Sequence, residues 1–407
     1  MPKPDPPLDA SEQPPEIVVG VVTSSFPVPN NPASGVFVER LVANMPPGVR
    51  PIVLLPCPNV ALMDQSEARY RTECFRYGPR SWLRLAHRPG GLPDAWRRRD
   101  PALLLLPLFL PAMFLACLRL AGKVDVIHGN WSLPALIASL AGRLRRRPAI
   151  ATLRGEDITR AESSWLFRAL LRACLAWNSR TVVVSEAMRD SLQRTFGRYA
   201  HRIDFVPNGV SADPASQTTA FHDPLRLVTV GSLIQRKRVA TLLQALVHED
   251  CPSTTVLRIV GEGPERASLE RLAQSLGVRD RVQFVGGVAP DDVPSHLQWA
   301  DLFVFASESE GRPNAILEAM ASGLPILATD IPGVRELLGP RGGILFPVGD
   351  VTALVKAIGL LLNDPDLAQS LGHEARARID QLGLSWPASA ARYASIYRQV
   401  LAEAEKA

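Results

Sequence analysis

The segment SESEGRPNAILEAMASGLPILATD, residues 307–330, shows the plan of the fold in one unit. One apolar run, Leu302–Phe305, precedes it, and a second, Ile326–Ala328, lies near its end. Between them, Pro313 suits the first position of a helix, where a missing N–H loses no partner, and Gly323 suits the residue that ends it. Strands that are apolar throughout are typical of a parallel sheet covered by helices on both faces. The segment therefore predicts a strand–loop–helix–strand unit of an α/β domain.

The same alternation recurs along most of the chain. In the first half, apolar runs of strand length lie at Ile17–Val22, Pro51–Leu55, Val124–His128, Ala149–Leu153, Thr181–Ser185 and Ile203–Val206. In the second half they lie at Leu225–Val230, Val256–Val260, Val282–Val285, Leu302–Phe305 and Ile326–Ala328. Helix-like segments separate most of these runs, which predicts two doubly wound, Rossmann-like α/β domains. Because ligands of such sheets bind where the strands end, we expect the domains to face each other across a cleft.

The composition is that of a globular protein with an uneven charge. The chain has 407 residues, of which 46% are hydrophobic and 21% charged. Residues 1–205 hold 27 basic and 17 acidic residues, a surplus of +10, whereas residues 206–407 hold 18 and 23, a surplus of −5. A basic half favours an anionic partner such as anionic lipid, a phosphorylated acceptor or nucleic acid. No helix-turn-helix, finger or stacking motif is found, so we expect no nucleic acid partner.

The cysteines predict neither a disulfide framework nor a zinc site. They are odd in number, lie far apart and form no C-x-x-C pair, at Cys57, Cys74, Cys117, Cys174 and Cys251. In a chain of this size that pattern favours a reducing, cytoplasmic location.

Residues 80–119 combine arginines with a long apolar stretch. Arg80, Arg84, Arg88 and Arg97–Arg99 come before the apolar segment Pro101–Gly122. The segment is about as long as a minimal membrane span of ~17–20 residues, but prolines interrupt it and it runs directly into a strand. Two interpretations stay open: a buried helix of the domain, or a peripheral contact with an anionic membrane. A true span would separate two halves of one sheet and is disfavoured.

The helix of the opening segment begins at a predicted anion site. The amides of Asn314, Ala315 and Ile316 would have no partner there, and the positive end of the helix dipole favours a phosphate. Glu318 lies four residues after Asn314, on the same helix face, and Glu310 lies in the preceding loop. Both carboxylates can therefore approach one bound ligand.

Two further loops contain residues suited to a diphosphate. In VGSLIQRKRVATLLQA, Arg236 and Lys237 follow a strand that ends at Gly231. Adjacent cations at that point would neutralise the charge that grows on a diphosphate leaving group. In IVGEGPERASLERLA, Gly261 and Gly263 lie between a strand and a helix, where they suit either a close approach of ligand or only a tight turn.

Taken in order, these motifs resemble glycosyltransferase family 4, whose members are retaining enzymes of the GT-B fold. The resemblance covers most of the chain. One departure is Ser232, where many members have an arginine after the glycine. The resemblance rests on a loop ending at Gly35, PNGV (207–210), GSLIQRK (231–237), GEGP (261–264), Glu310-x7-Glu318, PGVRE (332–336) and GGILFPVGD (342–350).

The resemblance implies three catalytic residues and a mechanism. Arg236 and Lys237 would bind the donor diphosphate, and Glu310 would contact the donor sugar and stabilise the transition state. Glu318 would hydrogen-bond the ribose hydroxyls. The acceptor would attack from the side of the departing diphosphate, with retention at the anomeric carbon and with neither a cofactor nor a metal. Further positions implied to bind the nucleotide sugar are Gly35, Gly231, Gly261, Gly263, Asn314, Ala315, Ile316 and Leu317.

The acceptor side is predicted from two strand ends. VDVIHGNWSLPA places His128 and Asn130 at one end, and TLRGEDI places Arg154 and Asp157 at another. In the family these segments line the acceptor cleft, and many members have a histidine where Arg154 stands. TLRGEDI is similar to enzymes of teichuronic-acid-type polysaccharide assembly. Two structural alternatives stay open: a hydrogen-bonded strand-end His128, and a salt bridge between Arg154 and Asp157.

Together, pattern and resemblance give a domain plan and a function. We expect a cytoplasmic glycosyltransferase, peripheral on the inner face of the membrane, that moves a sugar from a nucleotide-diphosphate sugar to a glycan, lipid-linked or polysaccharide acceptor in cell-envelope or exopolysaccharide biosynthesis. The alternatives are a nucleotide-sugar epimerase of the same fold and a non-catalytic basic binding protein. The plan is a disordered lead-in at 1–15, an acceptor domain at 16–210, a linker at 211–224, a nucleotide-sugar domain at 225–385, and a helix at 386–407 that crosses back to the first domain.

Overall fold

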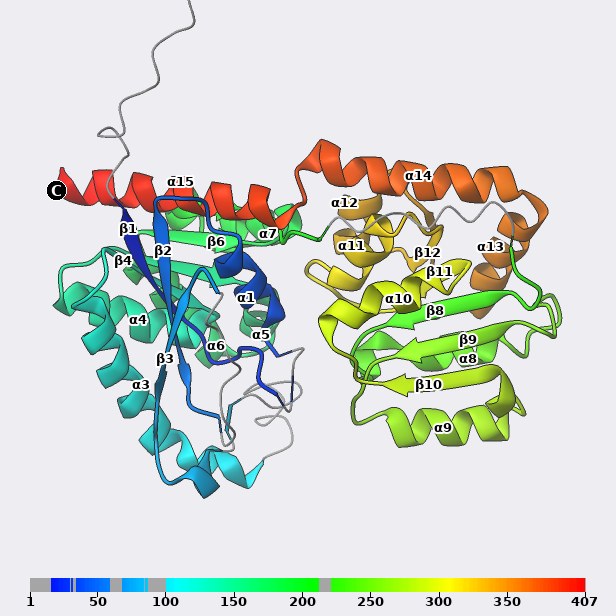
Figure 1. Ribbon diagram of the computed structural model, residues 1–407, viewed down its shortest axis with the longest axis horizontal. Coiled ribbons are helices and arrows are strands. Elements are labelled where there is room, and N and C mark those ends of the chain that lie inside the picture. Colours follow the sequence, from blue (N-terminus) through cyan, green and yellow to red (C-terminus); the bar gives the residue numbers. More distant parts are fainter. Residues whose placement is uncertain are drawn as a thin grey trace, which may run out of the picture.

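The structure, a computed structural model, describes most of the chain. The predicted lead-in, most of the predicted linker, and Arg84, Arg88 and Arg97–Arg99 lie outside the described residues. The described residues form two parallel sheets with helices on their faces, arranged as two domains side by side (Figure 1). The predicted fold class is therefore confirmed. The described residues are 16–29, 31, 34–58, 68–83, 85–86, 100–211 and 221–406.

The N-terminal sheet has seven strands in the order β3-β2-β1-β4-β5-β6-β7, and every neighbouring pair is parallel. The strand order reverses between β1 and β4, which creates a crevice at the carboxyl ends of these strands. The strands are β1 (Ile17–Val22), β2 (Val49–Pro56), β3 (Arg71–Phe75), β4 (Val126–Asn130), β5 (Ala149–Leu153), β6 (Arg180–Val183) and β7 (Ile203–Phe205). The helices are α1 (Val36–Ala43), α3 (Leu106–Ala121), α4 (Ser132–Leu144), α5 (Glu156–Ser163), α6 (Trp165–Trp177) and α7 (Glu186–Thr195).

The C-terminal sheet has six parallel strands in the order β10-β9-β8-β11-β12-β13. Its order reverses between β8 and β11, the two strands whose following loops carry Arg236, Lys237 and Glu310. The strands are β8 (Arg226–Val230), β9 (Val256–Val260), β10 (Val282–Gly286), β11 (Leu302–Phe305), β12 (Ile326–Thr329) and β13 (Ile344–Phe346). The helices are α8 (Val239–Ala245), α9 (Arg266–Ser275), α10 (Val293–Gln298), α11 (Asn314–Ala321), α12 (Pro332–Leu338), α13 (Val351–Asn363) and α14 (Pro365–Leu382).

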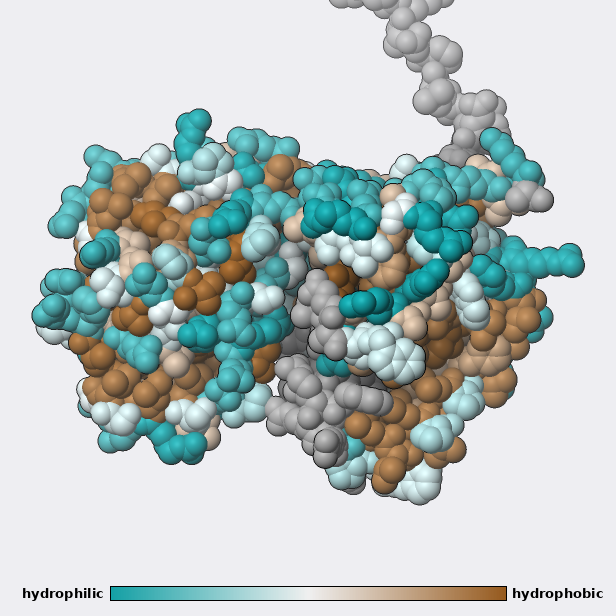
Figure 2. All heavy atoms as spheres, turned by 180° about the vertical axis from the view of Figure 1, so that it is seen from behind, coloured by the Kyte–Doolittle hydropathy of each residue, from teal (hydrophilic) through white to brown (hydrophobic). Residues whose placement is uncertain are grey.

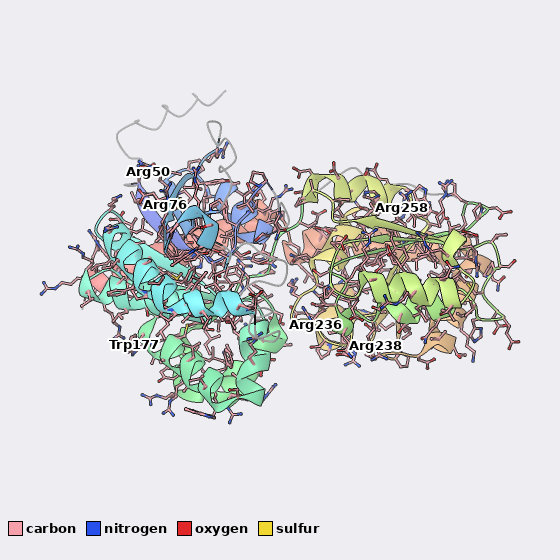
Figure 3. All side chains as sticks on the ribbon, turned by 90° about the horizontal axis from the view of Figure 1, so that it is seen from below. Arg50, Arg76, Trp177, Arg236, Arg238 and Arg258 are labelled. Atoms are coloured by element: carbon pink, nitrogen blue, oxygen red, sulfur yellow. A yellow bond between two sulfur atoms is a disulfide. The ribbon has the colours of Figure 1, made fainter. Side chains whose placement is uncertain are left out.

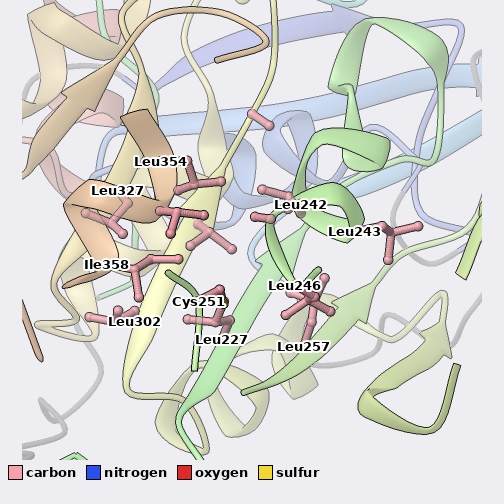
Figure 4. Close-up of a cluster of buried hydrophobic side chains, with 14 of the residues drawn as sticks. Leu227, Leu242, Leu243, Leu246, Cys251, Leu257, Leu302, Leu327, Leu354 and Ile358 are labelled. Carbon is pink, nitrogen blue, oxygen red and sulfur yellow. The ribbon is translucent and has the colours of Figure 1, made fainter. Parts of the chain in front are cut away.

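Leucines fill the core on one face of the C-terminal sheet (Figure 4). Leu227, Leu302 and Leu327 project from neighbouring strands, and Leu242 of α8 and Leu354 of α13 pack against them, all at most 2% exposed. Truncating one such side chain to alanine costs about 2–5 kcal/mol, since the cavity does not collapse completely. The core thereby fixes the strand ends from which the donor loops emerge.

The last helix, α15 (Trp386–Glu405), lies along the N-terminal domain (red in Figure 1). Its buried Tyr393, Tyr397 and Val400 pack in one cluster with residues of β1 and α1. The chain therefore passes between the domains twice, and the two passages touch, because the amide of Val210 donates to the carbonyl of Leu384 at 2.8 Å. A Cβ on Gly209 would overlap the backbone of Trp386, so only glycine fits at this crossing.

The structure corrects two expectations about the N-terminal domain. Strand β3 was not predicted, because its sequence RTECF is largely polar and lies at the sheet edge. The prediction that the cysteines form no disulfide was wrong for one pair: Cys57 follows β2, Cys74 lies in β3, and the two are bonded with Cα atoms 4.9 Å apart. Register, and not sequence spacing, brings them together, since Leu55 pairs with Cys74 in the sheet.

Alanine at two glycines should change stability in opposite directions. Gly209→Ala should lower the melting temperature, because the new methyl group overlaps the backbone of Trp386. Gly359→Ala is the matched control: a Cβ there meets nothing within 4 Å, and the residue lies inside α13. The control should gain roughly 0.5–1 kcal/mol, the usual helical difference between these residues. Thermal unfolding of both variants checks this, and an equal shift would contradict the close crossing.

Candidate active site

A buried carboxylate held by two cations forms the centre of the candidate site. Glu310 Oε1 lies 2.7 Å from Lys237 Nζ, and Glu310 Oε2 lies 3.2 Å from Arg236 Nη1. The Ser307 hydroxyl donates to Glu310 Oε1 at 2.9 Å. The side chain of Glu310 is 10% exposed and that of Lys237 16%, whereas that of Arg236 is 44% exposed. One cation is thus embedded and the other open to solvent, on the side of the domain that faces the N-terminal domain (Figure 3).

The electrostatics of this cluster keep Glu310 ionised. Burial alone would raise the pKa of Glu310, but the charges of Lys237 and Arg236 and hydrogen bonds from Lys237 and Ser307 together lower it below its ordinary value. The outcome follows from distance, because two opposite charges within about 4 Å outweigh the loss of water. The Glu310 carboxylate is therefore ionised at neutral pH.

Two loops are fixed against each other to build this cluster. Arg236 and Lys237 lie in the 3-10 turn η5 (Gln235–Lys237), which follows β8, while Glu310 follows β11. The amide of Glu308 donates to the carbonyl of Arg236 at 2.9 Å, and the hydroxyl of Thr329 donates to the carbonyl of Ser307 at 2.6 Å. Hydrogen bonds to backbone carbonyls at adjacent strand ends, in addition to the ion pairs, therefore set the position of Glu310.

The glycines near this loop act through close packing. A Cβ on Gly261 would overlap the carbonyl of Gly231, and one on Gly263 would overlap the backbone of Leu233. Gly231 has φ of 153°, and a Cβ there would lie 3.7 Å from Lys237 Nζ. The glycines of the predicted G-x-G at residues 261–263 thus pack directly against the backbone of the segment that leads into Arg236 and Lys237. Among these glycines, Gly231 is the one that borders a site side chain.

The predicted helix start differs in detail. Helix α11 begins at Asn314, and Pro313 precedes it in extended backbone with φ of −76° and ψ of 113°. The amides of Ile316 and Leu317 both donate to the carbonyl of Pro313, at 3.2 and 3.4 Å, so they are not free. The amides of Asn314 and Ala315 remain at the helix start for an anion.

Glu318 and Asn314 line a cavity of about 300 Å³ between the domains. Arg40 of α1 also lines it, and its guanidinium pairs with Asp291 of the C-terminal domain. Burial raises the pKa of Glu318 to about 7, although the charge of Arg40 lowers it in part. None of Arg236, Lys237 and Glu310 is among the residues that line this cavity. The four predicted residues therefore form two features, joined by the short chain from Glu310 to Asn314.

Helix α1, which follows Gly35, borders the N-terminal side of this cavity through Val36 and Arg40. Gly35 has φ of 63° and immediately precedes α1, whose residue Val36 lines the cavity. A Cβ on Gly35 would overlap the carbonyl of Ser25. The glycine therefore allows a tight fold of this loop on itself beside the cavity.

Arg154 connects the acceptor side to the start of α11. Its Nη1 donates to Asn208 Oδ1 at 2.8 Å, and its Nη2 donates to Asn130 Oδ1 at 3.1 Å. The side-chain amide of Asn208, through Nδ2, then donates to Asn314 Oδ1 at 3.0 Å. The guanidinium stacks over Phe37, with its carbon 4.1 Å from the ring centroid. Burial lowers the pKa of Arg154 to about 10, which leaves it charged at neutral pH.

Asp157 does not form the side-chain salt bridge that was one alternative. Its Oδ1 accepts from the amide and the hydroxyl of Ser132, at 2.8 and 2.6 Å, and Oδ2 lies 3.5 Å from the amide of Arg154. The carboxylate therefore holds the start of α4 against the loop after β5. Arg154 has amide oxygens, and not a carboxylate, as its side-chain partners.

His128 lies in a buried cluster beneath α15. It is 0% exposed, with Nδ1 2.8 Å from the hydroxyl of Tyr397 and Nε2 2.7 Å from that of Thr152. Its ring stacks on Tyr393, and burial lowers the pKa of His128 to about 3. The alternative of a hydrogen-bonded strand-end histidine describes this geometry, since the side chain is fully buried.

Comparison with known proteins now decides the family. Residues 48–214 match the family described as Glycosyltransferase Family 4, and residues 213–378 match that described as Glycosyl transferases group 1. A GDP-mannose-dependent alpha-(1-6)-phosphatidylinositol monomannoside mannosyltransferase of Mycolicibacterium smegmatis is 30% identical over 68% of this chain and 78% of its own. The chain belongs to glycosyltransferase family 4. An N-acetyl-alpha-D-glucosaminyl L-malate synthase of Bacillus anthracis is 27% identical over 69% of this chain and 76% of its own.

Solved structures share the fold of this family 4 glycosyltransferase. Sucrose-phosphate synthase of Thermosynechococcus elongatus superimposes with a TM-score of 0.75 at 22% identity, covering 95% of this chain and 100% of that one. Anabaena HepE in complex with UDP superimposes with a TM-score of 0.71 at 19% identity, covering 94% and 100%. The fold is GT-B.

Sequence reasoning missed several residues that connect the two domains of this glycosyltransferase. Buried Arg312 donates to Glu336 Oε1 at 2.6 Å, and Glu336 Oε2 accepts from the amide of Glu186 at the start of α7. Within the N-terminal domain it also missed Trp131, which follows β4 with φ of 65°, a backbone conformation that residues with a side chain rarely adopt. The centroid of its ring lies 5.8 Å from that of Phe37 in α1. The PGVRE motif contained Glu336, but the partner of its carboxylate lies 150 residues away and has no signal in the sequence.

The pKa of Glu318 predicts a pH-dependent stability. The folded chain holds the proton of Glu318 up to about pH 7, whereas the ordinary pKa is 4.5. The folded state therefore binds more protons between these values, and the free energy of unfolding falls as pH rises through this window. Gln at this position cannot ionise, so the free energy of unfolding of Glu318→Gln should exceed that of the wild type by on the order of 3 kcal/mol well above pH 7 and equal it at about pH 4. Urea unfolding across this range checks the prediction, and a difference that does not vary with pH would contradict it.

Proposed function

We propose that this glycosyltransferase moves a sugar from a nucleotide-diphosphate sugar to a glycan, lipid-linked or polysaccharide acceptor, with retention at the anomeric carbon. The observation that carries the proposal is the buried Glu310 carboxylate between Lys237 and Arg236, a few residues before the start of α11. Donors named in relatives and neighbours support the donor class: the mannosyltransferase is GDP-mannose-dependent, and HepE has been solved with UDP-glucose.

The basic turn suits the leaving group. In the free protein, one carboxylate partly neutralises two cations. A bound diphosphate carries more negative charge than Glu310 and would draw Arg236, the more exposed cation, and Lys237 toward it. As the glycosidic bond breaks, negative charge grows on the diphosphate, so both cations stabilise the transition state more than the ground state. Glu310 would then face the donor sugar, where its negative charge stabilises positive charge on the anomeric carbon.

The Glu318 cavity suits the nucleoside. A carboxylate accepts two hydrogen bonds from a vicinal diol such as the ribose hydroxyls, and the ionised form accepts better than the neutral form. Because Glu318 has a pKa of about 7 in the free protein, binding of the ribose favours loss of its proton. Asn314 lines the same cavity and begins the helix whose first amides would reach a phosphate.

The acceptor would enter on the side of Arg154. Gly155 follows it, and a Cβ there would lie 3.6 Å from the Cα of Gly311, so the loop that bears Glu310 faces the loop that bears Arg154. With no side-chain base needed in a same-side attack, an oxygen of the departing diphosphate takes the acceptor proton. The proposal requires no cofactor and no metal.

The setting completes the proposal. We place the enzyme in the cytoplasm, peripheral on the inner face of the membrane, with contact through residues 80–119, in cell-envelope or exopolysaccharide biosynthesis. The apolar segment Pro101–Ala121 supports this setting, because it is long and apolar enough to span a membrane and yet only 22% of its most apolar stretch is buried in the protein.

Nucleotide binding tests the donor site. We expect one of UDP, GDP or ADP to raise the melting temperature, and Lys237→Ala and Glu318→Ala each to abolish the rise, because one removes a diphosphate contact and the other a ribose contact. Arg271→Ala, an exposed basic residue on α9, is the charge-matched control and should keep the full rise. Thermal-shift measurements decide, and the donor assignment fails if no nucleotide diphosphate stabilises the wild type.

Product stereochemistry tests the transfer step. With the sugar form of the stabilising nucleotide, proton NMR should show a product with the anomeric configuration of the donor. Glu310→Gln keeps the size of the side chain but removes the charge, so kcat should fall by roughly 10²–10³-fold, as for loss of one preorganised electrostatic contact. Nucleotide release that does not depend on acceptor would favour an epimerase, and an inverted product would contradict retention.

A further inference from the structure

Three adjacent helices of the N-terminal domain form an outer face without an acidic residue. Helix α4 packs against α3 on one side and α6 on the other. None of the three contains an Asp or Glu, whereas α3 contains Arg119, α4 contains Arg143, and α6 contains Arg168 and Arg172. The outer three-helix face is defined here as the exposed side chains of α3 with its leading turn η3 (Pro101–Leu105), of α4 and of α6.

Large apolar side chains stand out from this face. Leu104, Leu108 and Leu115 are 82%, 47% and 50% exposed, and their spacing of four and seven residues places them along one stripe. Leu144 at the end of α4 is 61% exposed, and Trp165 at the start of α6 is 80% exposed. Apolar residues cover the lower outer part of the N-terminal domain as seen from behind (Figure 2). Contiguous exposed apolar surface of this kind marks an interaction site.

The inner side of α3 shows that it is a surface helix of the domain. Phe109, Met113, Cys117 and Leu120 are at most 1% exposed and pack on the sheet. The helix therefore cannot leave the domain to cross a bilayer without exposing this core. Its outer stripe, by contrast, has no covering partner among the described residues.

Arginines gather at one edge of the same face. The three helices each return to a parallel strand, so their carboxyl ends lie at one edge of the sheet. Arg119, Arg143, Arg145 and Arg146 are exposed at that edge, and Arg143 lies over the ring of Trp177 at 5.5 Å. Among the described residues, Arg119, Arg145 and Arg146 have no acidic partner within ion-pair distance. These charges are available to an external anion.

We propose that the outer three-helix face docks on an anionic lipid bilayer. The leucines and Trp165 enter the boundary between headgroups and acyl chains, while the arginines contact lipid phosphates. Basic residues on one side, Leu and Trp on the other and no acid are the signature of a surface that lies in the membrane interface. The proposed function places the membrane contact at residues 80–119, and the present proposal extends that contact to α4 and α6. It rests on the proposed function only for the location of the enzyme at the membrane.

Docking in this way places the cleft beside the bilayer. The amino ends of α3, α4 and α6, where Leu104 and Trp165 lie, are at the carboxyl ends of the strands, the same edge of the sheet at which Asn130 and Arg154 lie. A lipid-linked acceptor anchored in the same bilayer would thus reach the acceptor side without leaving the membrane. The face consequently fits the acceptor class proposed for the enzyme.

Vesicle sedimentation tests the proposal. The full chain should sediment with vesicles of phosphatidylcholine mixed with phosphatidylglycerol, should bind phosphatidylcholine alone much more weakly, and should be released by high salt because screening weakens the arginine contacts. Equal binding to both vesicles, or no binding to either, would overturn it. Protein that stays in native membranes after both salt and alkaline washes would also overturn it, in favour of a spanning segment.

Two double variants locate the contact. Arg145→Glu with Arg146→Glu should reduce binding to the anionic vesicles by at least ~10-fold, since each basic residue near such a surface contributes roughly fivefold. Leu104→Ser with Trp165→Ser should reduce it through loss of apolar insertion. The matched controls lie on the C-terminal domain: Arg271→Glu with Lys356→Glu for charge, and Val247→Ser with Leu360→Ser for apolar exposure. Equal losses in controls and variants would contradict the assigned face.

The nucleotide thermal shift separates this proposal from the proposed function. Both face variants should keep the full rise in melting temperature with the stabilising nucleotide, because none of their residues lies in the donor site. Loss of vesicle binding with the thermal shift intact supports the docking face. An intact vesicle interaction in a chain that binds no nucleotide would overturn the donor assignment alone.

Discussion

The ion pair between Glu310 and Lys237 is the constraint on which the rest of the site depends. A lysine and a glutamate that are each mostly buried would be costly alone, because water no longer solvates either charge. Their contact at 2.7 Å, with Arg236 on the second carboxylate oxygen, offsets that cost. It also ties the loop after β8 to the loop after β11, and so fixes where α11 begins. The start of α11 in turn determines the positions of the predicted phosphate site and of Glu318 in its cavity.

The relative position of the two domains depends on polar contacts between them and on the two places where the chain passes from one domain to the other. The chain passes between the domains near Val210 and again near Leu384, and the two passages are bonded to each other. Around this crossing, Arg40 pairs with Asp291, and Asn208 bonds to Asn314. These polar contacts are partly exposed, in contrast to the leucine core of the C-terminal domain. The cleft is thus a place where a ligand can compete with existing bonds.

Much of the fold could be predicted because it rests on local pattern. Apolar runs fixed most strands of both sheets, and the spacing of Glu310 and Glu318 placed one on the loop and one on the helix. Strand β3 escaped because an edge strand needs no apolar run, and the disulfide escaped because strand register has no local signal. His128 shows the same limit: a residue at a strand end faces a cleft only if no later element covers it, and α15 does. The separation of Glu318 from the basic turn also depends on how the domains meet, which no motif contains.

The most direct measurement is a crystal structure of the protein with the nucleoside diphosphate that stabilises it. The account predicts diphosphate oxygens within hydrogen-bond distance of Lys237 Nζ, of the Arg236 guanidinium and of the first amides of α11, with the ribose against Glu318. A diphosphate bound elsewhere, with Lys237 and Arg236 still paired only to Glu310, would contradict it.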